Sequence, residues 1–516
     1  MPVFLFLIEF IQKNAYIFFM SVNFRKISPD EAAEYIKHND TVACSGFTAA
    51  GCIKKVTGSL AKKAEREHFS GKNFQIRLFS GASTTDHVDG ALSRAKAISY
   101  RTPYQSNKDT RIAINQGEIA YADQHLSSYP QSINYGFLGD IDYAIVEVSD
   151  YTSDGDLTLT MSAGAVPTFC RNAKHIILEH NKFYAGKLQW LHDIYELNNP
   201  PHRQAIPLLT PSDRIGTTTL KVDPNKIIGI VETCEEDHLA DFKEVSPIHE
   251  KIGQNVAQFF LQEIKSGRIP PSFLPIQSGV GNIANAVLKT MGMEKRIPTF
   301  SVYSEVAQDA VIDLMEAGRV TFTSACALTL TSEHTKKIFD NLDYYKQRLV
   351  IRPQEITNHP EIIRRLGLLA MNAALEVDIF GNVNSTHVLG SSIMNGIGGS
   401  GDFARNGYIS IFTLPSTAKD GAISSIVPFC SHIDHTEHDV QIIVTEQGVA
   451  DLRGKAPAER AQCIIENCAH PDYKPLLRDY LKLTNNQHIG HNLSAAFKFY
   501  QAYQETGDMR NCKFSE

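Results

Sequence analysis

The sequence predicts an α/β protein with two open, mostly parallel sheets, each in its own domain. Short apolar runs end in Gly- or Ser-rich turns and alternate with helical stretches, which is typical of strands joined by crossover helices. The chain has 516 residues, of which 43% are hydrophobic and 21% charged, so it is long enough for two large domains with their own cores.

The first half of the chain repeats this alternation of strands and helices, and the acidic stretch that follows does not. "DTVACSGF" precedes the helical "CIKKVTGSLAKKAER", and "FQIRLFSGAST" precedes "TDHVDGALSRA". The apolar runs "DYAIVEVSD", "HIILEH" and "KIIGIVE" predict further strands. The acidic stretch "VETCEEDHLADFKEVSP" has no apolar period, so we place the first domain at 21–232, a linker at 233–246 and the second domain at 247–516.

The second half follows the same order of elements. "NVAQFFLQEIKSG" predicts a helix that Gly267 ends, "FLPIQSGVGNIANAVLKTMG" a strand, a Gly turn and a helix, and "PTFSVYSEVAQDAVIDLMEAG" a strand and a helix again. "EIIRRLGLLAMNAALEVD" predicts one long helix, and "GYISIFTLPS", "ISSIVPF" and "VQIIVTE" predict strands. In open α/β sheets ligands bind beyond the carboxyl ends of the strands, and Glu305 lies at such an end.

The first 20 residues are predicted to be an N-terminal extension that need not be native. They are apolar, but polar residues such as Glu9 and Lys13 make them a poor membrane span, and a signal-peptide cleavage site is missing. Met20 opens "MSVNFRKISPDEAAEYI", which reads like a protein start. The alternative is a loosely packed amphipathic tail.

Charge and cysteine content narrow the class of protein. The net charge of −7 argues against a nucleic-acid binder, which needs clustered Lys and Arg. The nine cysteines are odd in number and form no close CxxC pair, so we expect free thiols and a reducing, cytoplasmic compartment. We expect neither a nucleic-acid partner nor a membrane.

Two Gly-rich turns are candidate ligand sites. "GVGNIA", 279–284, fits the G-x-G-x-x-A dinucleotide pattern after a strand, and Glu305 would then be the ribose ligand. A plain turn, or another ligand or oxyanion site, explains it as well. "MNGIGGSGDFARN", 394–406, packs four glycines together, which indicates positive φ angles or close approach of the backbone to another group.

The remaining motifs give only weak indications of a functional site. "FCSHIDHTEHDV" carries His432, His435 and His438, but no second cluster completes a zinc site, so we interpret them as hydrogen-bonded loop histidines. A G-x-S-x-G elbow and a Walker loop are absent from the sequence. We consider three hypotheses for the Glu305 side chain: a charge in the first turn of a helix that Ser304 caps, a ribose ligand, or a nucleophile.

A set of motifs spread over the chain resembles the acetyl-CoA hydrolase/transferase family, and most of all its succinyl-CoA:acetate CoA-transferases of class I. The resemblance runs from about Ser21 to about residue 500 and rests on "GASTTDHVDGAL", "PIQSGVGNIANAV", "YSEVAQD", "RPQEITNHPEIIRRLG", "EVDIFGNVNSTHV", "NGIGGSGDFARN" and "HIDHTEHDVQIIVTEQGVADLRG". It implies a CoA-transferase fold with the active site at the interface of the two domains.

The resemblance also implies roles for single residues. Glu305 is the nucleophile, Asn358 contacts the acyl oxygen, and the amide of Gly399, which follows Gly398, assists the reacting carboxylate. The remaining implied site residues form the oxyanion hole and contact CoA, with the oxyanion-hole amide at Val280 or Gly281: Gly279, Val280, Gly281, Asn282 and Gly398.

The implied reaction moves CoA between a small acyl-CoA, succinyl-CoA or acetyl-CoA, and a carboxylate such as acetate. It is a ping-pong reaction through a glutamyl-CoA thioester, with no metal and no cofactor besides the CoA substrate, in a homodimer. A carboxylate is ionised at neutral pH, so it needs no general base to become a nucleophile. Its attack on the thioester creates an oxyanion, and each hydrogen-bond donor placed to stabilise that oxyanion is worth about 10²–10³ in rate. Hydrolysis of acetyl-CoA at the same site, a dinucleotide-dependent oxidoreductase and a non-catalytic acyl-CoA binder are the alternatives.

Overall fold

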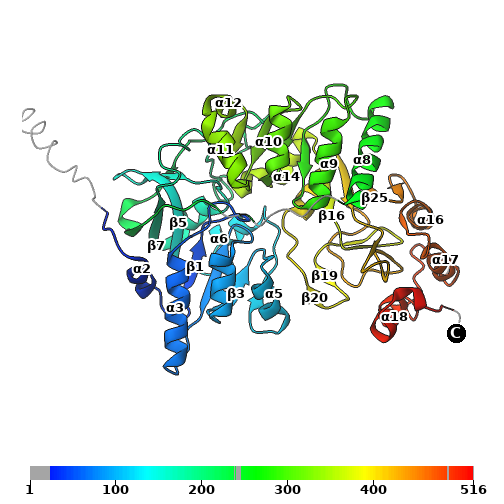
Figure 1. Ribbon diagram of the computed structural model, residues 1–516, viewed down its shortest axis with the longest axis horizontal. Coiled ribbons are helices and arrows are strands. Elements are labelled where there is room, and N and C mark those ends of the chain that lie inside the picture. The colour runs from blue at the N-terminus through cyan, green and yellow to red at the C-terminus, as the bar shows by residue number, and fades with distance from the viewer. Residues whose placement is uncertain (1–23, 238, 240–245, 485–486, 515–516) are drawn as a thin grey trace, which may run out of the picture.

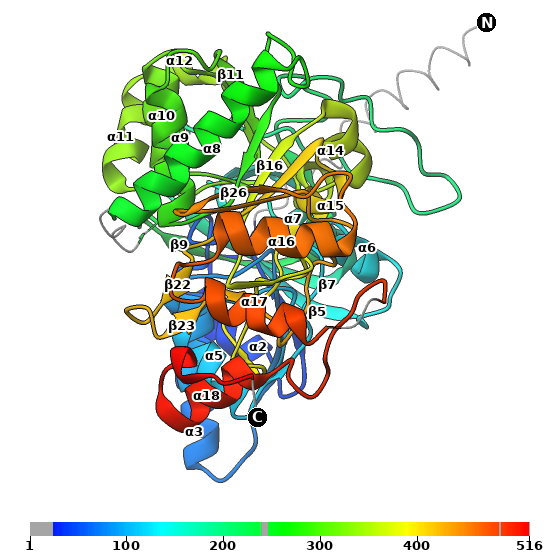
Figure 2. The same ribbon diagram turned by 90° about the vertical axis from the view of Figure 1, so that its right-hand side faces the viewer.

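The computed structural model describes residues 24–237, 239, 246–484 and 487–514. The predicted extension at 1–20 and half of the predicted linker, residues 238 and 240–245, lie outside the described residues. Figure 1 shows the N-terminal half in blue to cyan beside the C-terminal half in green to red, and Figure 2 shows the last helices, α16 to α18, stacked along one side.

The N-terminal half is built on one mostly parallel sheet. Its parallel strands follow the order β4-β3-β2-β1-β5-β7-β9, and β6 and β8 continue antiparallel from β5. The parallel strands are β1 Thr41–Cys44, β2 Ile76–Ser80, β3 Ile98–Thr102, β4 Ala120–Tyr121, β5 Ile141–Tyr151, β7 Ala173–Asn181 and β9 Ile227–Thr233. The antiparallel strands and the helices are β6 Asp156–Leu159, β8 Leu220–Lys221, α2 Pro29–Tyr35, α3 Val56–Phe69, the π-helix Asp86–Gly90, α4 Ala91–Arg94, α5 Lys108–Asn115, α6 Tyr129–Asn134, α7 Val166–Asn172 and the 3₁₀ turn Pro224–Lys226.

The C-terminal half is built on a second sheet in the order β15-β13-β11-β10-β16-β21-β25-β26, parallel except for the last pair. Its strands are β10 Ile276–Ser278, β11 Phe300–Tyr303, β13 Val320–Ala325, β15 Leu349–Ile351, β16 Leu369–Ala373, β21 Ile409–Thr413, β25 Ile442–Thr445 and β26 Gly448–Asp451. The two parallel sheets confirm the predicted fold class.

Helices and short strand pairs surround the second sheet. The helices are α8 Pro247–Lys265, α9 Asn282–Met293, α10 Asp309–Glu316, α11 Ser332–Asp340, α12 Leu342–Lys346, α13 Gln354–Thr357, α14 Pro360–Leu366, α15 Ser400–Asn406, α16 Pro457–Cys468, α17 Lys474–Lys482, α18 Lys498–Thr506 and the 3₁₀ turn Met509–Asn511. The short strands are β12 Val306–Ala307, β14 Ala327–Leu328, β17 Glu376–Asp378, β18 Val383–Asn384, β19 His387–Val388, β20 Ser392–Ile393, β22 Thr417–Ala418, β23 Ile423–Ser424 and β24 Ile426–Val427.

One predicted element is wrong, and another forms two short strands in place of one. The long helix expected over "EIIRRLGLLAMNAALEVD" ends at Leu366, because Gly367 takes φ +69°, and β16 follows. The run Leu369–Ala373 lies between β10 and β21, where the sheet satisfies its backbone, and all of it except Ala373 is buried. "ISSIVPF" forms the short strands β23 and β24, which pair outside the main sheet.

The two halves are joined by a shared core and by backbone hydrogen bonds. The rings of Tyr184 and Phe339 meet at 6.1 Å. The amide of Leu328 donates to the Met161 carbonyl at 2.9 Å, so β14 is held by the N-terminal half. The buried guanidinium of Arg352 contacts the carboxylate of Asp193 from that half.

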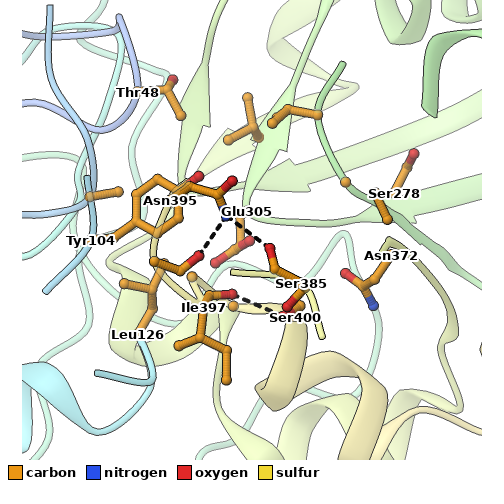
Figure 3. Close-up of a pocket in the computed structure, with 18 of the residues that line it drawn as sticks. Thr48, Tyr104, Leu126, Ser278, Glu305, Asn372, Ser385, Asn395, Ile397 and Ser400 are labelled. Atoms are coloured by element: carbon orange, nitrogen blue, oxygen red, sulfur yellow. Dashed lines mark hydrogen bonds between the residues drawn. The ribbon is translucent and has the colours of Figure 1, made fainter. Parts of the chain in front are cut away.

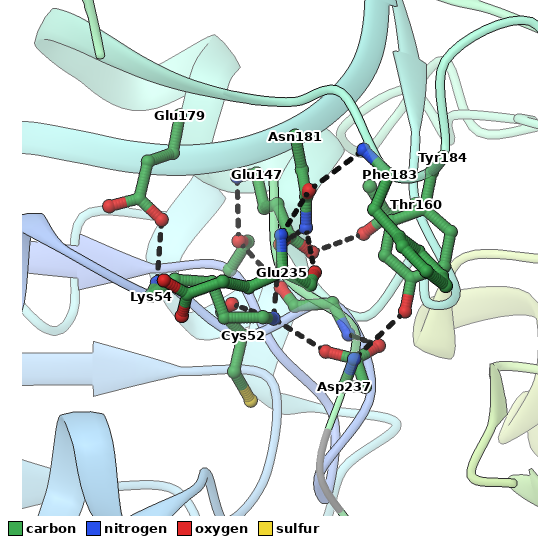
Figure 4. Close-up of polar contacts among 12 residues, drawn as sticks. Cys52, Lys54, Glu147, Thr160, Glu179, Asn181, Phe183, Tyr184, Glu235 and Asp237 are labelled. Atoms are coloured by element: carbon green, nitrogen blue, oxygen red, sulfur yellow. Dashed lines mark hydrogen bonds and ion pairs between the residues drawn. The ribbon is translucent and has the colours of Figure 1, made fainter. Parts of the chain in front are cut away.

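A buried charge cluster ties the segment after β9 to the N-terminal half (Figure 4). The ammonium of Lys54 lies 2.6 Å from Asp237 Oδ1 and 3.0 Å from Glu147 Oε1, and all three side chains are at most 8% exposed. Asp237 also accepts the amide of Gly51 at 3.0 Å. Glu179 accepts the backbone amides at the start of α3, where the helix dipole favours a negative charge.

We expect Lys54→Met to lower the free energy of unfolding by about 3–5 kcal/mol, because it leaves two buried carboxylates without their cation. The neighbouring Lys55→Met is the matched control, since Lys55 is 45% exposed and pairs with Glu235 at the surface, where an ion pair is worth at most about 1 kcal/mol. Urea unfolding of the two variants measures the difference. Equal stability of both variants would contradict a structural role for the cluster.

Candidate active site

A cavity of about 280 Å³ lies where the carboxyl ends of the two sheets meet. The N-terminal half lines it with residues that follow β1, β2, β3 and β4, and the C-terminal half with residues at the ends of β10, β11 and β16 and with the loop before α15. In the second sheet the chain leaves β10 on one side for β11 and returns on the other side at β16, so the cavity lies at the switch point where open α/β sheets bind ligands. The site is therefore at the interface of the two halves, as the resemblance implied.

Glu305 lies in the middle of this cavity, between side chains of both halves (Figure 3). It follows β11 and precedes β12, and helix α10 begins only at Asp309. The reading of Glu305 as a first-turn charge capped by Ser304 is therefore wrong: Gln308 occupies the N-cap position. The Glu305 carbonyl accepts the amides of Cys326 at 2.8 Å and Ala327 at 3.0 Å, which fixes the backbone under the carboxylate.

Asn358 holds the carboxylate from behind. Its Nδ2 donates to Glu305 Oε1 at 2.7 Å and to Asp402 Oδ2 at 3.2 Å, and its Oδ1 accepts the Thr357 hydroxyl at 2.9 Å. Asn358 is fully buried and is not among the residues that line the cavity. Its amide group thus meets the nucleophile candidate directly.

Burial raises the pKa of the Glu305 carboxyl from about 4.5 to about 7. The Asn358 hydrogen bond opposes this rise, and the nearby Asp402 carboxylate adds to it. The carboxyl is enclosed by the chain, although the residue keeps part of its surface towards the cavity. A carboxylate with a raised pKa in a cavity is a pattern typical of functional sites.

The Gly-rich loop at 396–401 approaches both Glu305 and the N-terminal half. A Cβ on Gly399 would lie 2.0 Å from Glu305 Oε1, and one on Gly396 would lie 2.3 Å from the Tyr121 hydroxyl. Gly398 has φ +59°. The close approach and the positive φ expected from four neighbouring glycines are both present.

The turn after β10 contributes to the same cavity through Gly279 and Val280. The Gly279 amide donates to the Met371 carbonyl at 3.0 Å, so it is already used within the sheet. Gly281 has φ +105° and is the N-cap of α9, and Asn282 is the first residue of that helix. Neither Gly281 nor Asn282 is among the lining residues, and their roles stay predictions.

Several lining residues carry no pattern in the sequence. Thr48 and Tyr104 come from the N-terminal half, and Ser278 and Asn372 stand at the ends of the adjacent strands β10 and β16. The signal for them is only that each lies at or just after a strand's carboxyl end. Ser278 Oγ and Asn372 Nδ2 are buried and have no hydrogen-bond partner among the described residues.

The remaining predicted features lie outside the cavity. Hydrogen bonds join His432 to Asp434 at 3.1 Å, His435 to Ser400 at 3.1 Å and His438 to Thr436 at 3.3 Å. Within the described ranges, no three metal-binding side chains lie close enough to hold an ion. The nine cysteines, all in described segments, are free thiols, as expected. A search of the described helices finds none with the length and apolar character needed to cross a membrane.

The strand order does not by itself exclude a dinucleotide. Counted along the chain from β10, the parallel strands follow the order 4-3-2-1-5-6-7. This order reverses beside the first strand, as the order 3-2-1-4-5-6 of dinucleotide-binding sheets does, with the GVGN turn after the first strand and Glu305 after the second. The contacts of Glu305 differ from those of a ribose ligand, because one oxygen is bound by Asn358 and the Gly399 backbone covers it.

Two protein-family models match the chain. The model of the acetyl-CoA hydrolase/transferase N-terminal domain matches residues 13–232, and the model of the C-terminal domain of the same family matches residues 335–481.

Curated relatives cover nearly the whole chain. It is 48% identical to a propanoyl-CoA:succinate CoA transferase of Escherichia coli K12, over 95% of this chain and 100% of the relative. It is 45% identical to a succinyl-CoA:acetate CoA-transferase of Clostridium kluyveri, over 94% of this chain and 90% of the relative. It is 41% identical to an acetyl-CoA hydrolase of Schizosaccharomyces pombe, over 93% of this chain and 95% of the relative.

Solved structures share the fold at lower identity. RipA from Yersinia pestis superimposes with a TM-score of 0.68 at 22% identity, over 89% of this chain and 97% of that one. A 4-hydroxybutyrate CoA-transferase from Porphyromonas gingivalis gives a TM-score of 0.61 at 21% identity, over 89% of this chain and 97% of that one.

We expect Glu305→Gln to stabilise the protein in a pH-dependent way. Because the folded-state pKa is raised to about 7, the ionised carboxylate lowers stability as pH rises from the unfolded-state pKa, about 4.3, to 7. The variant should gain little at about pH 4.5 and up to about 3 kcal/mol at about pH 8.

Denaturant unfolding at both pH values measures this difference. Glu333→Gln on α11 is the control, since that side chain is 76% exposed and such a substitution changes stability by about 0.5 kcal/mol or less. A gain from Glu305→Gln that is the same at both pH values would contradict the raised pKa.

Proposed function

This chain belongs to the acetyl-CoA hydrolase/transferase family, and we propose that it moves CoA between a small acyl-CoA and a carboxylate with Glu305 as the nucleophile. The observation that carries the proposal is the Glu305 carboxylate in the cavity between the sheets, with one oxygen held by Asn358 at 2.7 Å. The substrates that we propose are succinyl-CoA or acetyl-CoA and acetate, since two relatives are named for CoA transfer among such acids.

The reaction has two chemically matched halves. Glu305 attacks the thioester carbonyl, the C–S bond breaks, and a mixed anhydride and CoA thiolate form. The thiolate then attacks the Glu305 carbonyl, which gives the glutamyl-CoA thioester and releases the first carboxylate. A second carboxylate reverses these steps and leaves as the new acyl-CoA, so no proton, metal or cofactor is needed.

The hydrogen bond from Asn358 assigns different tasks to the two oxygens of Glu305. Oε1 accepts from Asn358, so the other oxygen, Oε2, is free to attack. After attack, Oε1 remains the carbonyl oxygen of the anhydride, and it becomes the oxyanion when the thiolate adds. Asn358 is thus placed where negative charge develops on the enzyme's own side chain, and such a donor is worth about 10²–10³ in rate.

Donors for the oxyanion of the substrate come from the Gly-rich segments. The amides of Val280 and Gly281 have no acceptor among the described residues, which suits the oxyanion-hole role. We propose that the Gly399 amide assists the reacting carboxylate and that the enzyme acts as a homodimer. CoA contacts through 279–282 and Gly398 belong to the same proposal.

Hydrolysis is the second candidate function, because relatives named acetyl-CoA hydrolase match almost as much of the chain. The same glutamyl-CoA thioester would then react with water. Assays of acetyl-CoA consumption with and without an added carboxylate separate the two: a transferase stalls without an acceptor, whereas a hydrolase continues.

The test of the proposed function is exchange of labelled acetate into acetyl-CoA with no other acceptor present. A ping-pong enzyme catalyses this exchange through its first half-reaction, and we expect Glu305→Gln to lose it by at least about 10³-fold. Exchange at the wild-type rate in the Gln variant would overturn the role of Glu305.

We also expect kcat/KM for the acyl-CoA to fall below about pH 7, by about tenfold per pH unit. Burial raises the pKa of Glu305 to about 7, so at lower pH the carboxyl of the free enzyme is protonated and cannot attack. Stopped-time assays from about pH 5 to 9 measure the profile. A flat profile down to about pH 5 would show that the nucleophile titrates elsewhere.

A further inference from the structure

A second buried carboxylate lies behind Glu305, on the side away from the cavity. Asp402, in the first turn of α15, is 5% exposed and does not line the cavity. Its Oδ2 accepts from Asn358 Nδ2 at 3.2 Å, and the same nitrogen donates to Glu305 Oε1 at 2.7 Å. Two carboxylates therefore share one side-chain amide.

Asp402 is held in place by the other half of the molecule. Ser127, in the turn before α6, donates its amide to Oδ2 at 2.9 Å and its hydroxyl to Oδ1 at 2.5 Å. Burial raises the pKa of the Asp402 carboxyl, and the three donors from Ser127 and Asn358 oppose this rise by favouring the ionised form. The contact joins the two halves, and Asp402 belongs to the same helix, α15, that Gly399 precedes as the N-cap.

The Asn358 amide has its orientation fixed from three directions. Its Oδ1 accepts from Thr357, and its Nδ2 hydrogens go to Glu305 and Asp402. If the Asp402 acceptor were missing, the amide could rotate and present its oxygen to the Glu305 carboxylate, which would repel it.

We propose that Asp402 is a positioning residue for the nucleophile: it orients Asn358 towards Glu305 and keeps a negative charge behind the Glu305 carboxylate. The inference rests on the proposed role of Glu305. Because the two carboxylates bind the same nitrogen of Asn358, the negative charge of Asp402 disfavours ionisation of Glu305. It thereby makes the ionised Glu305 a stronger base and nucleophile. The hydrogen bonds from Ser127 make the position of Asp402 depend on the contact between the two halves.

Burial is the largest cause of the raised pKa of Glu305, and Asp402 is the charged group that adds to this rise. Burial raises the pKa of the Tyr104 phenol and of the Cys326 thiol, which face Glu305, so both stay neutral near pH 7. Burial lowers the pKa of His435, which contacts Ser400 on α15, to about 4. His125 packs against Gly401 from the N-terminal half and faces Asp402.

Asp402→Asn tests the proposal, because an amide of the same shape can accept from Asn358 and the Ser127 amide and donate to the Ser127 hydroxyl. We expect the acid limb of kcat/KM to move to lower pH by about one unit and the plateau at high pH to fall several-fold. A merely structural residue would change the plateau or the melting temperature without moving the limb. An unmoved limb in a folded Asp402→Asn variant overturns the proposal.

Ser127→Ala is a second variant in case Asp402→Asn does not fold. It removes one donor from Asp402, favours protonation of that carboxyl, and should move the limb in the same direction by a smaller amount. A limb that stays in place or moves to higher pH overturns the proposal.

Asp439→Asn is the matched control for charge. Asp439 pairs with Arg405, in the last turn of α15, at 3.1 Å, and its loss should leave the limb in place. A shift equal to that of Asp402→Asn would make the effect one of net charge and overturn the proposal. If Glu305→Gln keeps its label exchange, the proposed function itself fails; if it is inactive and Asp402→Asn leaves the limb unmoved, only the present inference fails.

Discussion

Keeping a negative charge on a buried side chain is the constraint around which the centre of this molecule is arranged. Glu305 lies between two sheets, enclosed by the chain, and its side chain accepts a hydrogen bond from Asn358. Burial of a carboxylate without a cation is unfavourable, so the group ionises only near neutral pH. Such a carboxylate is more basic than one in water, and the same enclosure that lowers stability makes it a better nucleophile.

The fold provides this enclosure by turning the carboxyl ends of two parallel sheets towards each other. Turns at those ends carry side chains from both halves, and small residues allow the backbone to come close. Gly399 lies against the Glu305 carboxylate where a Cβ would be 2.0 Å from Oε1, and Gly401 lies against His125 of the other half. The buried cluster around Lys54 fixes the segment after β9 near Gly51, a few residues from Phe47 and Thr48 of the cavity.

Local patterns in the sequence predicted most of this architecture. The strands β10 and β11, their turns and helices, and the position of Glu305 at a strand end follow from periodicity and Gly placement. The helix expected to continue through Leu369–Ala373 is a strand, because burial between two neighbouring strands outweighs helical propensity. Tyr104, Ser127 and Asp402 reach the site through contacts between residues far apart in the chain, which periodicity cannot reveal.

Mass spectrometry of the protein after incubation with acetyl-CoA tests the role of Glu305 most directly. The account predicts a glutamyl-CoA thioester on the peptide that contains Glu305, which hydroxylamine removes and which borohydride reduces to an alcohol. The adduct should be absent from Glu305→Gln and should disappear when acetate is added in excess. A wild-type enzyme that turns over acetyl-CoA without any modification of Glu305, or with the adduct on another residue, would contradict it.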